Sequence, residues 1–168
     1  MISVIGIDPG SRNTGWGIVH EVSGVLHLVC CGVIQPSCNG SFAERLAHIF
    51  QEISSIIMKY KPVEASVEQV FTAQNPLTAL KLGQARGAAV VACANQGLLI
   101  KDYEATTIKK TLVGHGRATK EQVSFMVGRS LGVKPDWPID TSDALATAIC
   151  HLTIRRFENR TARVAKTL

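Results

Sequence analysis

The spacing of apolar positions divides the chain into a strand-rich first third and a helix-rich remainder. Continuous apolar runs bounded by turn residues predict buried strands, whereas apolar residues that recur every three and four positions predict amphipathic helices. We therefore expect strands at Ile2–Asp8, Thr14–His20, Val25–Ile34, Val63–Val70 and Leu98–Tyr103. Helices are expected at Phe42–Tyr60, Pro76–Gln96, Thr107–Val113, Thr119–Leu131 and from about Asp140 to about Phe157.

The order of these elements predicts an α/β fold. Three strands joined by short turns form an antiparallel meander, and two further strands that alternate with helices extend the sheet. We expect a five-stranded mixed sheet with helices on both faces, in a single domain that occupies residues 1–157. Residues 158–168 are basic and have little apolar periodicity, so they are predicted to form a flexible tail.

Two helix starts carry local signals. Ser41 is a suitable N-cap for the first helix, and Asn75 followed by Pro76 combines an N-cap with proline at the first helical position. Further along the second helix, the segment Gly87–Ala94 has no polar side chain. A helix that is apolar all round is buried either within its own domain or against a partner subunit. The sequence leaves both possibilities open.

Composition and charge limit the partners and the cellular compartment that we expect for the chain. A formal net charge of +5 fits a polyanionic partner, although such charges are also typical of a solvated surface. The basic residues are dispersed through the second half of the chain and become denser in the tail. No apolar run is long enough to span a bilayer, and the N-terminus has no basic leader, so we expect neither membrane insertion nor secretion. The five cysteines include no C-x-x-C pair. They fit a reducing cytoplasm better than a zinc site.

Four carboxylates stand at the ends of predicted elements. Asp8 closes the first strand, Glu68 lies near the end of the fourth, and Asp140 and Asp143 lie at the start of the last helix. Each has a structural explanation: Asp8 suits an Asx turn before Pro9, Glu68 suits a solvent-facing position, and the last two suit a helix N-terminus. Taken singly, none of these residues identifies a site.

Their joint placement favours a metal site. Residues three apart on a helix share a face, so Asp140 and Asp143 can converge on one ion. Carboxylates gathered within a few ångströms raise one another's pKa and need cations to stay ionised. Hard Mg²⁺ or Mn²⁺ ions prefer oxygen ligands, and two ions about 3.5–4 Å apart can activate water and stabilise the leaving oxygen of a phosphodiester.

At these residues the chain resembles the RuvC family of Holliday-junction resolvases, within the ribonuclease H-like superfamily. The resemblance extends over nearly the whole chain in the family's order. The matching stretches are Ile5–Ser11 with Thr14-Gly15, Val67–Phe71, Ala79–Gly87 and Asp140–Ala146.

The resemblance implies a ribonuclease H-like fold and an endonuclease that cuts four-way DNA junctions symmetrically, leaving 5′-phosphate and 3′-hydroxyl ends. It implies that Asp8, Glu68, Asp140 and Asp143 are catalytic metal ligands, with Mg²⁺ as the cofactor, Mn²⁺ as a substitute and two ions per site. It further implies a homodimer and the RuvAB branch-migration motor as a partner. The expected DNA contacts are Phe71, Lys109, Lys120 and Arg117.

Two other functions compete with the nuclease. The stretch Gly6–Gly10 with Thr14-Gly15 is also similar to the phosphate-binding turn of actin-like and sugar-kinase-like ATPases, although such proteins need two lobes and this chain has residues for one. The second alternative is a junction-binding module that has lost catalysis. The presence of all four acids argues against it.

Overall fold

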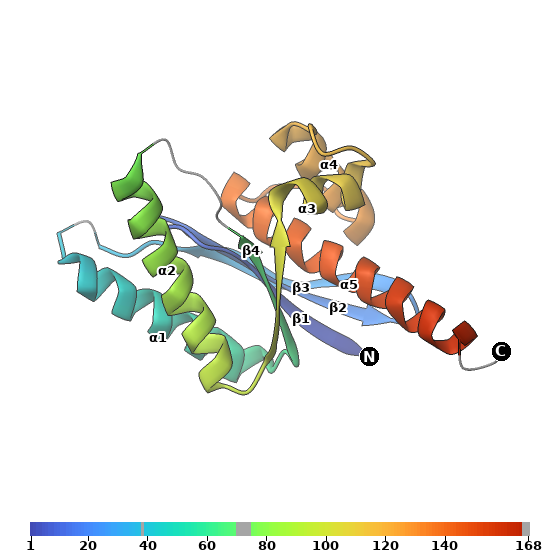
Figure 1. Ribbon diagram of the computed structural model, residues 1–168, viewed down its shortest axis with the longest axis horizontal. Coiled ribbons are helices and arrows are strands. Elements are labelled where there is room, and N and C mark those ends of the chain that lie inside the picture. Colours follow the sequence, from blue (N-terminus) through green and yellow to red (C-terminus); the bar gives the residue numbers. More distant parts are fainter. Residues whose placement is uncertain (38, 70–74, 166–168) are drawn as a thin grey trace.

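The computed structural model describes residues 1–37, 39–69 and 75–165, which form a mixed sheet between two layers of helices (Figure 1). The strands are β1 (Ile2–Asp8), β2 (Thr14–Val22), β3 (Val25–Ile34), β4 (Glu64–Gln69) and β5 (Leu99–Glu104). The helices are α1 (Phe42–Tyr60), α2 (Pro76–Asn95), α3 (Ala105–Val113), α4 (Lys120–Leu131) and α5 (Ile139–Ala165).

The sheet has the order β3-β2-β1-β4-β5. β1 pairs antiparallel with β2, which pairs antiparallel with β3, while β1–β4 and β4–β5 are parallel pairs. The predicted meander and the predicted mixed five-stranded sheet are therefore confirmed. β1 lies at the centre because its apolar run has to be buried on both faces.

The helix starts follow the predicted caps. The Ser41 side chain accepts a hydrogen bond from the backbone N–H of Glu44, whose carboxylate in turn accepts from the Ser41 N–H, which completes a capping box. The Asn75 side chain accepts from the backbone N–H of Thr78 at 2.8 Å. A second capping box, between Thr119 and Gln122, begins α4.

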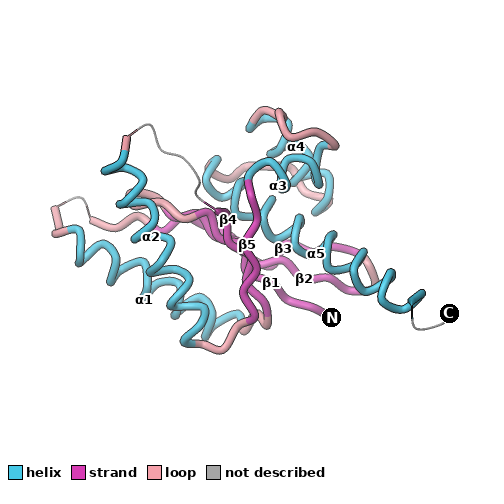
Figure 2. The backbone as a smooth tube through the Cα atoms, viewed as in Figure 1, coloured by secondary structure: helices cyan, strands magenta, loops and turns pink. Residues whose placement is uncertain are grey.

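Each face of the sheet has its own apolar core. Side chains alternate along a strand, so Ile5 and Ile7 pack beneath α1 and α2, while Val4 packs beneath α5 with α3 and α4. Figure 2 shows α1 and α2 side by side on one side of the sheet and α3–α5 on the other. The same alternation places Asp8 on the α5 face.

Glycines let α5 lie close to the β1–β2 hairpin. A Cβ built at position 6 would lie 2.9 Å from the Cβ of Ala148, and one built at position 15 would lie 2.6 Å from the carbonyl carbon of Asp140. Real Cβ contacts essentially never fall below 3.0 Å. The start of α5, with its two acids, is therefore held directly against the end of β1.

Ion pairs attach the middle of α5 to the far end of the sheet. Glu64 accepts hydrogen bonds from Arg155 Nε at 3.0 and 3.1 Å, and its Oε2 lies 2.6 Å from His151 Nε2. The Glu21 carboxylate accepts from Arg156 Nε at 3.1 Å. These contacts fix the direction of the helix relative to β2 and β4.

The predicted end of this helix is wrong. The helix continues through residues 158–165 beyond the expected end at Phe157, because Arg155 and Arg156 anchor it just before that point and helix-forming side chains follow. The Thr161 hydroxyl donates to the carbonyl of Glu158 at 2.9 Å, which extends the helical hydrogen bonding. The flexibility expected of residues 158–168 stays a prediction.

The α2 helix is buried along one side only. Ala85, Ala89 and Ala92 are fully buried in the core beneath α1, whereas Leu80 is 59% and Val91 is 56% exposed on the other side. The apolar segment Gly87–Ala94 is thus buried on one side and exposed on the other. Within the described ranges, none of the helices combines the length and apolar content that a membrane crossing requires.

Candidate active site

The parallel pairing of β1 with β4 brings two predicted acids side by side. Ile7 stands opposite Val67 in the register, so Asp8 and Glu68 are the next residues at adjacent strand ends. Both side chains lie on the face that α5 covers, because side chains alternate along a strand. The acids come from segments 60 residues apart in the sequence, and the sheet alone is enough to place them together.

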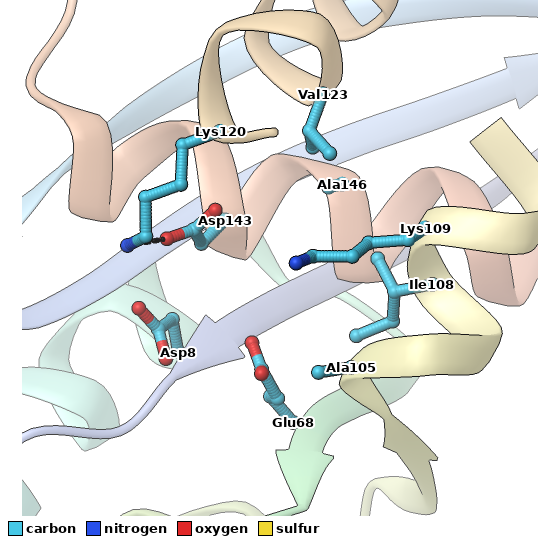
Figure 3. A pocket seen from close by; sticks show the side chains of 9 residues that line it. All are labelled: Asp8, Glu68, Ala105, Ile108, Lys109, Lys120, Val123, Asp143 and Ala146. Atoms are coloured by element: carbon cyan, nitrogen blue, oxygen red, sulfur yellow. Dashed lines mark hydrogen bonds and ion pairs between the residues drawn. The ribbon is translucent and has the colours of Figure 1, made fainter. Parts of the chain in front are cut away.

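A cavity of about 190 Å³ joins these strand ends to α3, α4 and α5. Figure 3 shows Asp8, Glu68 and Asp143 pointing into it, with Lys109 and Lys120 opposite. The remaining lining residues are apolar: Ala105, Ile108, Val123 and Ala146. The site therefore combines three carboxylates and two ammonium groups within an apolar rim.

The pKa values of two of these carboxyls are raised. Burial, followed by the charges of Glu68 and Asp143, raises the pKa of Asp8 to about 8. Burial, followed by the charge of Asp143, raises the pKa of Glu68 to about 7. Both effects disfavour the ionised forms, so the pocket has a deficit of positive charge that Lys120 only partly offsets.

The lysines lie at opposite sides of the acids. Lys120 Nζ donates to Asp143 Oδ2 at 2.7 Å, and this hydrogen bond raises the pKa of the lysine. Lys109, one turn into α3, lowers the pKa of Glu68 by its charge. The sequence predicts both as DNA contacts, and their position in the pocket is compatible with that role, which stays a prediction.

Of the other two predicted DNA contacts, the structure describes only Arg117. Arg117 is exposed in the loop between α3 and α4 and does not line the cavity. Phe71 lies outside the described residues. Both assignments stay predictions.

Asp140 stands at the edge of the acid cluster. It does not line the cavity, but its charge is close enough to raise the pKa of Asp8. Its Oδ2 accepts a hydrogen bond from Asn13 Nδ2 at 3.1 Å, and Gln35 Nε2 donates to Asn13 Oδ1 at 3.3 Å. The structure thus gathers three of the predicted acids in one pocket and leaves the fourth beside it, oriented by Asn13.

Three contacts that orient the acids or the helix turn carrying them were not found in the sequence. Asn13 lies 127 residues from Asp140, so no local pattern connects them. Trp137 Nε1 donates to the hydroxyl of Ser142 at 2.7 Å, and Ser124 Oγ lies 2.9 Å from that same hydroxyl. Since Ser142 stands between the two acids of α5, these bonds fix the first turn of the helix.

The carboxylates are chemically suited to bind a divalent cation, but their side chains are not arranged as a complete set of metal ligands. Among the residues that the structure describes, no three acidic, histidine or cysteine side chains already form a metal-binding group. The oxygen donors, their shared pocket and the raised pKa values of Asp8 and Glu68 all suit a hard cation, which would favour the ionised forms. Ligation therefore requires the side chains to adjust toward one another.

Comparisons with known proteins point to one family. Residues 4–151 match the family model described as crossover junction endodeoxyribonuclease RuvC. The chain is 61% identical to the crossover junction endodeoxyribonuclease RuvC of Oleidesulfovibrio alaskensis over 161 residues, which are 96% of each chain. It is 59% identical to that of Nitratidesulfovibrio vulgaris over 155 residues, or 92% of this chain and 93% of the relative.

A solved structure also has a similar fold. The chain is similar to Thermus thermophilus RuvC in complex with Holliday junction substrate, with a TM-score of 0.88 and 32% identity over 94% of this chain and 97% of that one. The predicted ribonuclease H-like fold class is confirmed by this likeness. The match also favours the nuclease hypothesis over the ATPase alternative.

Proposed function

Because this chain belongs to the RuvC family of crossover junction endodeoxyribonucleases, we propose that it resolves four-way DNA junctions at the pocket formed by Asp8, Glu68 and Asp143, with Asp140 at its edge. The observation that carries the proposal is the convergence of acids from β1, β4 and α5 beside Lys109 and Lys120. An acidic centre with cationic neighbours suits a phosphodiester, whose charge the lysines can neutralise.

The family is in general one of divalent-metal-dependent nucleases. We propose that Asp8, Glu68, Asp140 and Asp143 hold Mg²⁺, with two ions per site and Mn²⁺ as a substitute. When bound, such ions activate water and stabilise the leaving oxygen in phosphodiester hydrolysis. The expected products carry 5′-phosphate and 3′-hydroxyl ends.

The protein's own side chains would orient the substrate. Lys120 keeps Asp143 in place through their ion pair, and its Nζ is 2.7 Å from the carboxylate. Lys109 can bind a phosphate oxygen from the opposite side of the pocket (Figure 3). The apolar side chains of Ile108 and Val123 exclude water and strengthen these electrostatic contacts. Arg117, which does not line the pocket, and Phe71 are also proposed to contact the DNA.

We also propose that the chain acts as a homodimer. The exposed side of α2 offers Leu77, Leu80 and Val91 as an apolar surface for a second copy. A two-fold dimer presents two equal sites to the two-fold symmetric junction, which accounts for symmetric cleavage of paired strands. Coupling to the RuvAB branch-migration motor and a cytoplasmic location complete the proposal.

The test is cleavage of a synthetic four-way junction by the Asp8→Asn variant, compared with a linear duplex of the same sequence, with and without Mg²⁺. We expect the variant to bind the junction but not to cut it. Asp136→Asn serves as the matched control, since Asp136 is exposed and does not line the cavity. Cleavage by Asp8→Asn at the wild-type rate with Mg²⁺ would remove Asp8 from the mechanism.

A further inference from the structure

A second cavity lies beside the catalytic pocket, on the other side of the loop that joins β1 to β2. It has a volume of about 490 Å³ and lies between that loop and the first turns of α1 and α2. Arg12 and Asn13 come from the loop, Arg45 from α1, and Thr78 and Lys81 from α2. We call the cavity lined by Arg12, Arg45 and Lys81 the basic groove.

The charge of the basic groove is uncompensated. No acidic residue lines it, and in the part of the chain that the structure describes, Arg12, Arg45 and Lys81 form no ion pair. By contrast, Arg86 and Arg155 are each paired with a carboxylate. The residues outside the description, 38, 70–74 and 166–168, include no Asp or Glu.

Arg45 is the most informative of the three cations. Its Nε is buried and has no hydrogen-bond partner among the described residues, and a buried guanidinium N–H without an acceptor is costly. Within the described residues, no ion pair joins Arg45 to the neighbouring Glu44, whose carboxylate accepts from the Ser41 N–H at 2.6 Å in the capping box. An anion in the groove would satisfy the guanidinium.

The loop between the two cavities is tightly held. The Thr14 hydroxyl donates to the carbonyl of Gly10 at 2.8 Å and accepts from its N–H at 3.3 Å, and Thr14 is fully buried. On one side of the loop, Asn13 donates to Asp140. On the other side, Arg12 and Asn13 line the basic groove. The loop therefore stands between the acid pocket and the basic groove.

We propose that the basic groove binds the sugar–phosphate backbone of the junction strand that passes through the catalytic pocket, at phosphates next to the one that is cut. This inference rests on the proposed function and adds a binding site to it. Guanidinium groups bind phosphate oxygens in a bidentate manner, and Lys81 adds a point charge. Because the loop fixes the groove relative to Asp140, each bound phosphate helps to set the strand's register over the acids.

The first experiment measures salt dependence. Arg45→Gln, Lys81→Gln and the double variant are titrated with a labelled four-way junction by fluorescence anisotropy, without divalent metal, between about 50 and 200 mM salt. Each lost phosphate contact should make the negative slope of log affinity against log salt shallower by about 0.9. Over this salt range the affinity of the variant should therefore fall about 3-fold less than that of the wild type. Circular dichroism melts establish that the variants are folded.

Lys59→Gln is the matched control. It removes the same charge from the exposed last turn of α1. Arg45 lies in the first turn of the same helix, so the rise of an α-helix places the two residues about 20 Å apart. Its slope should equal that of the wild type. If the folded double variant also keeps the wild-type slope, the groove does not bind junction DNA and the inference is overturned.

The second experiment identifies the phosphates. Junctions with a single neutral methylphosphonate at successive positions beside the cut site are bound by the wild type and by the double variant. At the position facing the groove, we expect the wild type to lose affinity and the double variant to lose almost none, whereas Lys59→Gln loses as much as the wild type. Equal losses in all proteins at every position would overturn the inference.

A final pair of measurements distinguishes a DNA-binding groove from a site for free anions. Thermal stabilisation of the wild type by inorganic phosphate that is absent in the double variant, with an unchanged junction slope, would identify a free-anion site and overturn the DNA assignment. Cleavage of the junction by the wild type with Mg²⁺ is measured separately. Its absence would reject the proposed function, whereas its presence with unchanged slopes would reject the basic groove alone.

Discussion

The absence of a side chain at Gly15 lets α5 approach the end of β1 closely. Gly15 stands opposite Asp8 in the β1–β2 ladder and touches the backbone at the start of α5. The substitution Gly15→Ala puts a methyl group between two segments that carry the proposed catalytic acids, without changing any charge or removing any hydrogen-bonding side chain. It therefore tests whether the geometry of the acids, and not only their presence, determines cleavage.

The size of the displacement follows from the contacts. A Cβ at position 15 would lie 2.6 Å from the carbonyl carbon of Asp140, and ordinary contact begins at 3.4 Å. The helix start or the hairpin must therefore move by at least 0.8 Å, which is 3.4 minus 2.6. A misplacement of about 1 Å can lower a catalytic rate about 100-fold. Overpacking should also cost about 1–3 kcal/mol of stability.

The assay is single-turnover cleavage of a four-way junction with saturating Mg²⁺, together with junction binding in its absence. We expect Gly15→Ala to cut about 100-fold more slowly and to bind the junction nearly as well as the wild type. Gly116→Ala is the control, because a Cβ there would make ordinary contact with Thr106 at 3.6 Å. A folded Gly15→Ala that cuts at the wild-type rate would refute the reasoning.

Three further outcomes are expected. The folded-state pKa of Asp8 is about 8 and that of Glu68 is about 7, and both lie above their ordinary values. Without metal, the stability that these carboxyls contribute is therefore complete below about pH 4 and is lost as pH rises through 7 and 8. Melting curves should show this decline, and saturating Mg²⁺ should largely remove it. Lys120→Gln removes a charge that lowers the pKa of both acids, so the pH profile of cleavage should move to higher pH, and an unmoved profile would contradict this. Trp137→Phe removes the hydrogen bond to Ser142 and should cost about 1 kcal/mol, seen as a melting temperature about 2–4 °C lower.

Features that depend on neighbouring residues could be predicted from the sequence. The Ser41 and Asn75 caps, the antiparallel meander and the apolar strand that ends at Asp8 all follow from patterns within a few positions. The acids could be predicted as a group because strand ends and a helix start meet at one edge of such a sheet. The resemblance to a family then assigned their roles.

Features that depend on long-range contacts could not be predicted. The hydrogen bond from Asn13 to Asp140 joins two ends of the chain, and nothing near either residue indicates the other. The ion pair of Lys120 with Asp143 likewise depends on how α4 packs against α5. The position of α5 itself depends on the absence of side chains at Gly6 and Gly15, and the pattern of hydrophobic residues does not reveal this contact.

The location of Asp140 and Asp143 on the last helix has a consequence for protein synthesis. A ribosome-bound or prematurely terminated chain that stops before Ile139 contains Asp8 and Glu68 but lacks both other acids and the helix that covers β1 and β2. Such a fragment lacks two of the four proposed metal ligands. Unfinished copies therefore cannot assemble the four-acid site proposed for cleavage, which requires α5 to have been synthesised.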